Sequence, residues 1–196
     1  MAVAWMVGAA AAWALGPSLP LDDHARVTLE SSATVWGRSS TGGADHVWGA
    51  RVIDAPVDRV WGRILAYEDY EAFYPYVTES TIESRSWDGS NPRVVCVVDL
   101  TTRGVTTRYR MENLVHQAER WLEFRVTPAS SAPLETATGW WRVEPWGDDP
   151  ERTLVTYTMN VQTEWWVPGW FRALATRRVP TVLDALARRV GLDRAS

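Results

Sequence analysis

The sequence is poor in residues that form covalent or metal cross-links, with one cysteine and three histidines among 196 residues. Cys96 alone can form no internal disulfide, and its place in the apolar run 93–98 predicts a buried side chain. His24, His46 and His116 lie far apart and lack the paired spacing of zinc ligands. We therefore expect no disulfide, no metal site and no cofactor.

Lysine is absent. All 20 basic residues are arginine, and 24 acidic residues give the chain a formal net charge of −4. A nucleic-acid-binding protein usually shows a basic surplus that matches the phosphates. The acidic balance therefore argues against nucleic acid as a partner.

Common signatures of catalysis are also missing from the sequence. It has no G-x-S-x-G motif and no glycine-rich phosphate loop. The strand faces that we expect to point inward carry no carboxylate or imidazole for acid–base chemistry. Their polar residues are Thr107, Tyr109 and Tyr157. We assign no catalytic residue, and an enzyme is the less favoured alternative.

Aromatic residues, by contrast, are abundant, with 13 tryptophans and six tyrosines. Each combines a large, stiff apolar body with one polar atom, which suits the lining of a pocket or a boundary with water.

The N-terminal segment is uncharged and almost entirely apolar over residues 2–15. Its length fits the hydrophobic region of a signal peptide, and Ala12-Trp13-Ala14 resembles a cleavage site. No basic residue precedes Arg26, and Gly16-Pro17 interrupts the run before a full membrane span. We expect residues 1–20 to be a signal peptide or hydrophobic leader of an exported protein. An uncleaved anchor and a cytoplasmic protein are the alternatives.

Hydrophobic periodicity divides the rest of the chain into an α+β order. A helix over 21–30, a strand over 33–38, a loop over 39–45 and a strand over 46–53 come first. Two short helices follow. The first has Asp54 as its N-cap and carries Val57, Val60, Trp61, Ile64 and Leu65 on one face, and the second covers 69–74. From residue 77 the pattern has period two, which is typical of antiparallel strands with one buried face. The expected strands are 77–87, 93–102, 105–116, 119–127, 138–146 and 152–164.

The C-terminal segment predicts a long helix. Val179, Val182, Leu183, Leu186 and Val190 recur at helical spacing and form one apolar stripe. A helix that follows a sheet must bury such a stripe against it. We expect a curved antiparallel sheet wrapped around this helix, within a ligand-binding domain over 46–193 and behind an N-terminal extension over 21–45.

Several short motifs follow one another along the chain. They are Ile53-Asp54-Ala55-Pro56 with Val60-Trp61, Tyr67-Glu68-Asp69-Tyr70, Phe73 to Val77, Gly139 to Val143, Thr153 to Tyr157 and Val179 to Leu186. In this order they resemble the START-like (SRPBCC) helix-grip superfamily, closest to its polyketide cyclase/dehydrase or coenzyme-Q-binding branch. The resemblance implies an apolar ligand held between the sheet and the C-terminal helix. It does not specify a function, because this fold carries lipid transfer, hormone binding and cyclisation alike.

Strand alternation and the helical stripe point to the same location for a pocket. The expected lining residues are Phe73, Tyr76, Tyr109, Met111, Leu122, Phe124, Trp141, Tyr157, Met159, Trp170, Phe171, Leu174, Val182 and Leu186. We expect a hydrophobic ligand such as a lipid, a quinone or a polyketide-like compound. A cyclase or aromatase that uses pocket Tyr and Arg is one alternative, and a membrane-associated or protein-interaction domain without a ligand is another.

A membrane surface is a second expected partner. Trp165 and Trp166 precede Arg172, Arg177 and Arg178, and this mixture of tryptophan and arginine is typical of a membrane interface. The sequence gives no indication of the oligomeric state.

Overall fold

The computed structural model describes residues 17–41, 44–102, 104–128, 134–163 and 177–195. Most of the expected leader, residues 1–16, lies outside this part of the chain. None of the helices among the described residues is long and apolar enough to span a membrane.

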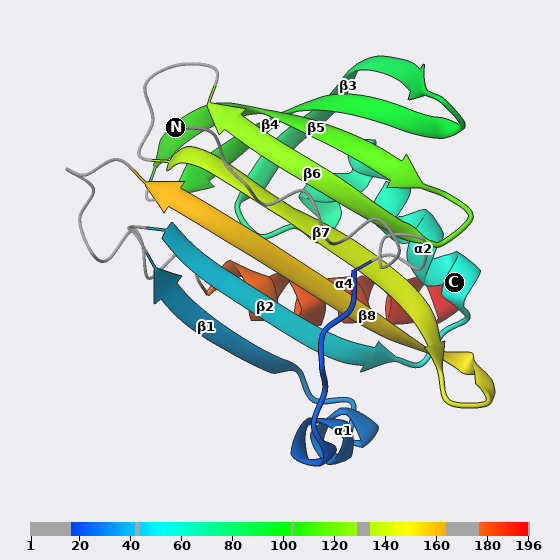
Figure 1. Ribbon diagram of the computed structural model, residues 1–196. Coiled ribbons are helices and arrows are strands. Elements are labelled where there is room, and N and C mark those ends of the chain that lie inside the picture. The colour runs from blue at the N-terminus through cyan, green and yellow to red at the C-terminus, as the bar shows by residue number, and fades with distance from the viewer. Residues whose placement is uncertain (1–16, 42–43, 103, 129–133, 164–176, 196) are drawn as a thin grey trace.

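Within the described residues, eight antiparallel strands form one curved sheet (Figure 1). Their order across the sheet is β1-β2-β8-β7-β6-β5-β4-β3. The expected meander from residue 77 onward is confirmed. The strands are β1 (Val35–Thr41), β2 (Ala44–Ile53), β3 (Val77–Asp88), β4 (Asn91–Thr102), β5 (Val105–His116), β6 (Trp121–Pro128), β7 (Leu134–Trp146) and β8 (Asp149–Thr163).

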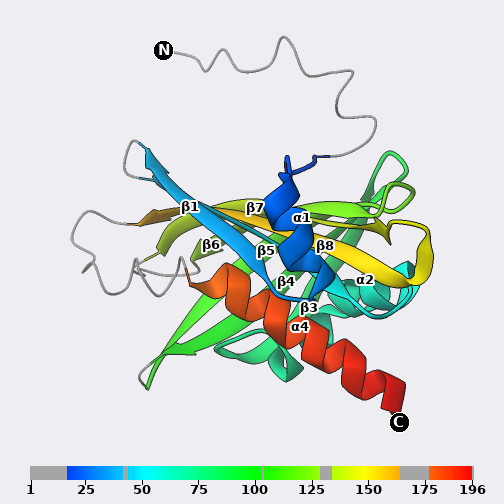
Figure 2. The ribbon, with the colours of Figure 1, turned by 90° about the horizontal axis from the view of Figure 1, so that it is seen from below.

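Helices occupy both faces of this sheet. The helices are α1 (Asp23–Glu30), α2 (Val57–Leu65), the 3₁₀ helix η2 (Tyr67–Ala72) and α4 (Arg178–Ala195). Helix α4 runs along one face of the sheet (Figure 2), and we call this the inner face. The expected α+β helix-grip arrangement, with two short helices after the first core strand, is confirmed.

The apolar stripe of α4 is buried as its spacing predicts. Val179, Val182, Leu183, Leu186 and Val190 are each at most 1% exposed. Pro180 is tolerated because it lies in the first helical turn, where a missing N–H breaks no helical hydrogen bond. The helix therefore starts close to this proline and lays its stripe on the sheet.

Strand β2 meets α4 through a glycine. A Cβ atom at Gly49 would lie 2.8 Å from Leu183 Cδ1 and 2.9 Å from Val179 Cγ1. Beside it, Arg51 binds Asp184 of α4, with Nη1 and Oδ1 2.6 Å apart. The close approach of helix and strand thus depends on the missing side chain.

Helix α1 packs on the opposite, outer face. Its Leu29 is fully buried against Ala50, Val52 and Leu154, which form a second, smaller core. The N-terminal extension therefore adds a helix to the outer face, and its strand β1 pairs with β2.

The expected loop over 39–45 is wrong. Strands β1 and β2 form a hairpin that reaches Thr41 on one side and Ala44 on the other. Asp45 is buried and accepts hydrogen bonds from Arg38 and Ser40 across the hairpin. Because these polar side chains satisfy one another, the polar sequence remains compatible with paired strands.

Two further details near the first helices differ from expectation. The second helix is a 3₁₀ helix over Tyr67–Ala72 rather than a helix over 69–74. The N-cap of α2 is Pro56, with no side-chain cap, and not Asp54. Asp54 instead pairs with Arg152, whose Nε lies 3.3 Å from its carboxylate, and this draws the aspartate away from the helix start.

Candidate ligand-binding site

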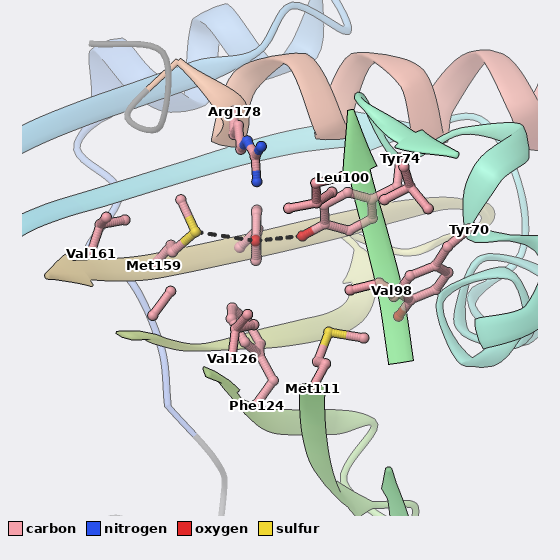
Figure 3. A pocket seen from close by; sticks show the side chains of 13 residues that line it. Tyr70, Tyr74, Val98, Leu100, Met111, Phe124, Val126, Met159, Val161 and Arg178 are labelled. Carbon is pink, nitrogen blue, oxygen red and sulfur yellow. Dashed lines mark hydrogen bonds between the residues drawn. The ribbon is translucent and has the colours of Figure 1, made fainter. Parts of the chain in front are cut away.

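A cavity of about 60 Å³ lies between the inner face of the sheet, the exit of η2 and the first turn of α4 (Figure 3). Its walls are almost entirely apolar, and one lining residue, Arg178, is charged. The lining residues are Tyr70, Tyr74, Val77, Val98, Leu100, Met111, Phe124, Val126, Ala137, Tyr157, Met159, Val161 and Arg178.

Strand alternation explains why these side chains meet. Met111 on β5 pairs with Val126 on β6, and Val126 pairs with Ala137 on β7. Ala137 in turn pairs with Val161 on β8. Directly opposed residues of an antiparallel pair point to the same face. A row of residues across four strands therefore forms one wall.

An aromatic cluster from η2 and its exit forms another wall. The rings of Tyr70 and Tyr74 are stacked with centroids 5.2 Å apart, and Phe73 lies edge-on to Tyr70 at 5.4 Å. The Tyr70 hydroxyl donates a hydrogen bond to the Ile64 carbonyl at 2.9 Å. The cluster is thereby fixed to the end of α2.

Two tyrosine hydroxyls give the cavity a polar end. The hydroxyls of Tyr74 and Tyr157 lie 2.6 Å apart, and the Tyr157 hydroxyl lies 3.7 Å from the sulfur of Met159. Trp141 stacks on the Tyr157 ring at 4.1 Å and holds it in place. Burial raises the pKa of both phenols, so both keep their protons at neutral pH.

Arg178 brings a positive charge to the same end. Its side chain points from the first turn of α4 into the cavity, toward the hydroxyl chain (Figure 3). Burial raises the pKa of Tyr74, Tyr109 and Tyr157, and the charge of Arg178 opposes this rise at all three. The guanidinium therefore lies within electrostatic reach of three phenols.

Tyr76 holds this arginine from the solvent side. The Arg178 Cζ lies 5.6 Å from the centroid of the Tyr76 ring, a cation–π contact. Tyr76 has a φ of 69°, which is unfavourable for a bulky residue. Its carbonyl accepts a 2.8 Å hydrogen bond from the Thr101 amide. The strained backbone thus directs the ring toward the arginine.

The residues that the sequence suggested for a pocket divide into four groups. Met111, Phe124, Tyr157 and Met159 line the cavity. Phe73, Tyr109, Leu122, Trp141, Val182 and Leu186 are buried in the surrounding core without lining it, and Tyr76 lies beside Arg178. Trp170, Phe171 and Leu174 lie outside the described residues.

Sequence reasoning missed the other lining residues. Val126 and Val161 follow the same alternation as their inward neighbours, so the pattern contained a signal for them. Tyr70 and Tyr74 carried no such signal, because the path of the short helix η2 decides which of its rings reach the cavity. The sequence suggested a membrane role for Arg178, whose side chain lines the cavity.

The remaining membrane candidates are placed only in part. Trp165, Trp166 and Arg172 lie outside the described residues, and Arg177 is exposed. Across the described residues no cluster of three or more His, Cys, Asp and Glu side chains is arranged to hold a metal ion.

The sheet wrapped around α4, with α2 and η2 inserted after β2, defines a helix-grip protein of the START-like class. A family described as polyketide cyclase / dehydrase and lipid transport matches residues 45–191. The match spans well over half of the chain, and the protein belongs to this family. No curated protein matches the sequence.

Solved structures with the same fold include an enzyme and a lipid-transfer protein. The Zhui aromatase/cyclase from Streptomyces sp. R1128 is 18% identical with a TM-score of 0.64, covering 76% of this chain and 94% of its own. A START superfamily protein from Mycobacterium smegmatis is 18% identical with a TM-score of 0.62, covering 75% and 97%. A STAR-related lipid transfer protein from Xanthomonas axonopodis is 15% identical with a TM-score of 0.54, covering 79% and 98%. At these identities the likeness concerns the fold.

Proposed function

We propose that this protein binds and carries a hydrophobic small molecule, such as a lipid, a quinone or a polyketide-like compound, in the cavity beside α4. The observation that carries the proposal is the cavity itself. It lies between the sheet and α4, and 12 of the 13 lining residues that the structure describes are uncharged at neutral pH. Apolar lining with a few convergent polar groups is typical of small-molecule sites.

The cavity must expand to accept such a ligand. Its volume of about 60 Å³ is well below the ~300–1,000 Å³ of common ligand pockets. Met111 on β5 and Met159 on β8 both line the cavity, and methionine side chains adapt readily because they are unbranched. Rotation of these two side chains is the simplest way to enlarge the space.

Native mass spectrometry of residues 21–196, purified gently from the organism that makes the protein, tests the proposal. We expect an apolar compound bound near one per chain, which denaturing extraction then releases for identification. A protein that is repeatedly empty and takes up nothing from a lipid and quinone panel would contradict it. That result would favour a domain that acts through a protein or membrane partner.

A cyclase-type enzyme is the second candidate, favoured by the polar end of the cavity. Tyr74, Tyr157 and Arg178 could orient a polyketide-like substrate there. The lining residues that the structure describes include no carboxylate or imidazole to act as a base, and burial raises the pKa of both tyrosines. This argues for binding over catalysis. Turnover of a polyketide-like substrate, lost in Tyr157→Phe, would support the enzyme; recovery of the substrate unchanged would support the carrier.

A further inference from the structure

Within the part of the chain that the structure describes, Arg178 is a cation without an acidic partner in an apolar cavity. Among the described residues it forms no ion pair or hydrogen bond, and its buried Nε has no hydrogen-bond partner. Its Cζ lies over the Tyr76 ring, 5.6 Å from the centroid. Removing a charge from water is costly unless it is paired. A ligand that covered this end of the cavity would have to supply the missing partner.

The two hydroxyls beside Arg178 offer a further donor. One of the Tyr74 and Tyr157 hydroxyls donates to the other, and the Tyr157 hydroxyl also contacts the Met159 sulfur at 3.7 Å. A thioether is a weak acceptor. A charged oxygen entering the cavity would offer a stronger acceptor, so a phenol O–H can join the guanidinium in binding it.

The charge count limits the kind of anion. Among the described lining residues, Arg178 is the one that is charged, and none of them is acidic and would repel a negative head group. One positive charge balances a carboxylate, whereas a phosphate monoester carries close to two negative charges at neutral pH. The guanidinium also matches the planar geometry of a carboxylate.

We infer that the ligand is a carboxylate amphiphile, with its carboxylate bound by Arg178 and the Tyr74–Tyr157 hydroxyls and its apolar tail in the cavity. This inference rests on the proposed function and specifies the ligand class for that site. A neutral ligand would cover Arg178 without pairing it, so the site also discriminates against ligands with a neutral head group.

Binding of two ten-carbon probes tests the inference. Decanoate and decan-1-ol differ in their head groups, and each is titrated at pH 8 by isothermal calorimetry. The readout is selectivity, the Kd of decan-1-ol divided by that of decanoate. Hydrogen bonds to charged groups are strong enough that Arg178→Gln should lower this selectivity about ten- to hundredfold. Arg178→Lys keeps the charge but loses the planar fork, so its selectivity should be intermediate.

Arg188→Gln is the matched control, because Arg188 is an exposed arginine of the same helix. Its selectivity should equal that of the unchanged protein. Near-UV circular dichroism checks that each variant folds, and Arg178→Met, which keeps most of the alkyl stem, replaces the glutamine variant if that one does not fold.

Two results would overturn the inference without deciding the proposed function, which native mass spectrometry tests separately. One is equal selectivity in the unchanged protein and both neutral Arg178 variants. The other is a protein that does not bind decanoate but yields a neutral apolar compound on extraction. A protein that binds no apolar compound at all would remove both the inference and the proposed function.

Discussion

The hydroxyls of Tyr74 and Tyr157 lie 2.6 Å apart although the residues are 83 positions apart in the chain. One belongs to the exit of η2 and the other to the inner face of β8, so the contact joins the two walls of the cavity. Trp141 stacks behind Tyr157, and Tyr70 stacks on Tyr74. The polar end of the site is therefore fixed by the packing of four aromatic rings.

Removing one of these hydroxyls should destabilise the protein more than removing both. Tyr157→Phe leaves the Tyr74 hydroxyl without its partner, at a cost of about 1–3 kcal/mol in the free energy of unfolding. In the double variant with Tyr74→Phe, no unpaired hydroxyl remains, and most of the loss should be recovered. Urea unfolding of the two single variants and the double variant measures this coupling. Additive losses would show that the two hydroxyls do not interact.

Filling the cavity should weaken ligand binding without unfolding the protein. Ala137 is a small lining residue on β7, and Ala137→Ile places three extra carbons in the cavity. We expect affinity for the extracted ligand to fall at least about tenfold, or ~1.4 kcal/mol. Thr138→Ile changes the neighbouring residue, whose side chain points to the outer face, and should bind normally. Equal binding by both variants would place the ligand elsewhere.

Adding one methyl group between β2 and α4 should lower the stability of the folded protein. Gly49→Ala brings a Cβ atom to within 3 Å of both Leu183 Cδ1 and Val179 Cγ1, so these buried side chains or the helix that carries them must shift. Overpacking of this kind costs about 1–3 kcal/mol. Gly62→Ala is the control, because its Cβ meets nothing within 4 Å and alanine favours a helix interior by about 0.5–1 kcal/mol. The melting temperature should fall for Gly49→Ala and rise for Gly62→Ala. A shift in the same direction for both variants would contradict the close approach of β2 and α4.

Stability should fall at alkaline pH through Cys96. Burial raises the pKa of its thiol from 9.0 to about 12. Above pH 9 the unfolded chain releases this proton while the folded protein retains it, so stability declines by about 1.4 kcal/mol per pH unit. The contribution is complete below pH 9 and is lost between about pH 9 and 12.

The Cys96→Ala variant isolates this effect from buried tyrosines, which begin to contribute near pH 10. Between pH 9 and 10 the unchanged protein should lose stability in urea unfolding and the variant should not. If the free energy of unfolding fell equally with pH in the two proteins, the thiol would have the same pKa in the folded and the unfolded state.

The sequence predicted what depends on local periodicity. Alternation along the strands identified Met111, Phe124, Tyr157 and Met159 as inward-facing, and the helical stripe identified the buried side of α4. The leader, the domain limits and the membrane role of Trp165 and Trp166 remain predictions.

Features that depend on tertiary contacts could not be predicted. The contact between Tyr74 and Tyr157 requires the path of η2, which has no periodic signal of its own. Arg178 lies in the first turn of α4. If the helix began one or two residues later, its side chain would no longer be directed by the helix, so its direction depends on where the helix starts. The charge pattern alone therefore could not show that this arginine faces the cavity.

The most direct test of the central claim is to locate the bound ligand in the protein. Methionine methyl NMR is suited to it, because Met111 and Met159 line the cavity and two of the four methionines, Met1 and Met6, lie in the N-terminal segment. Assignments come from Met111→Leu and Met159→Leu. On titration with the extracted ligand, the account predicts saturable shifts of the Met111 and Met159 methyl signals at one ligand per chain. Saturable binding that leaves both signals unmoved would contradict it.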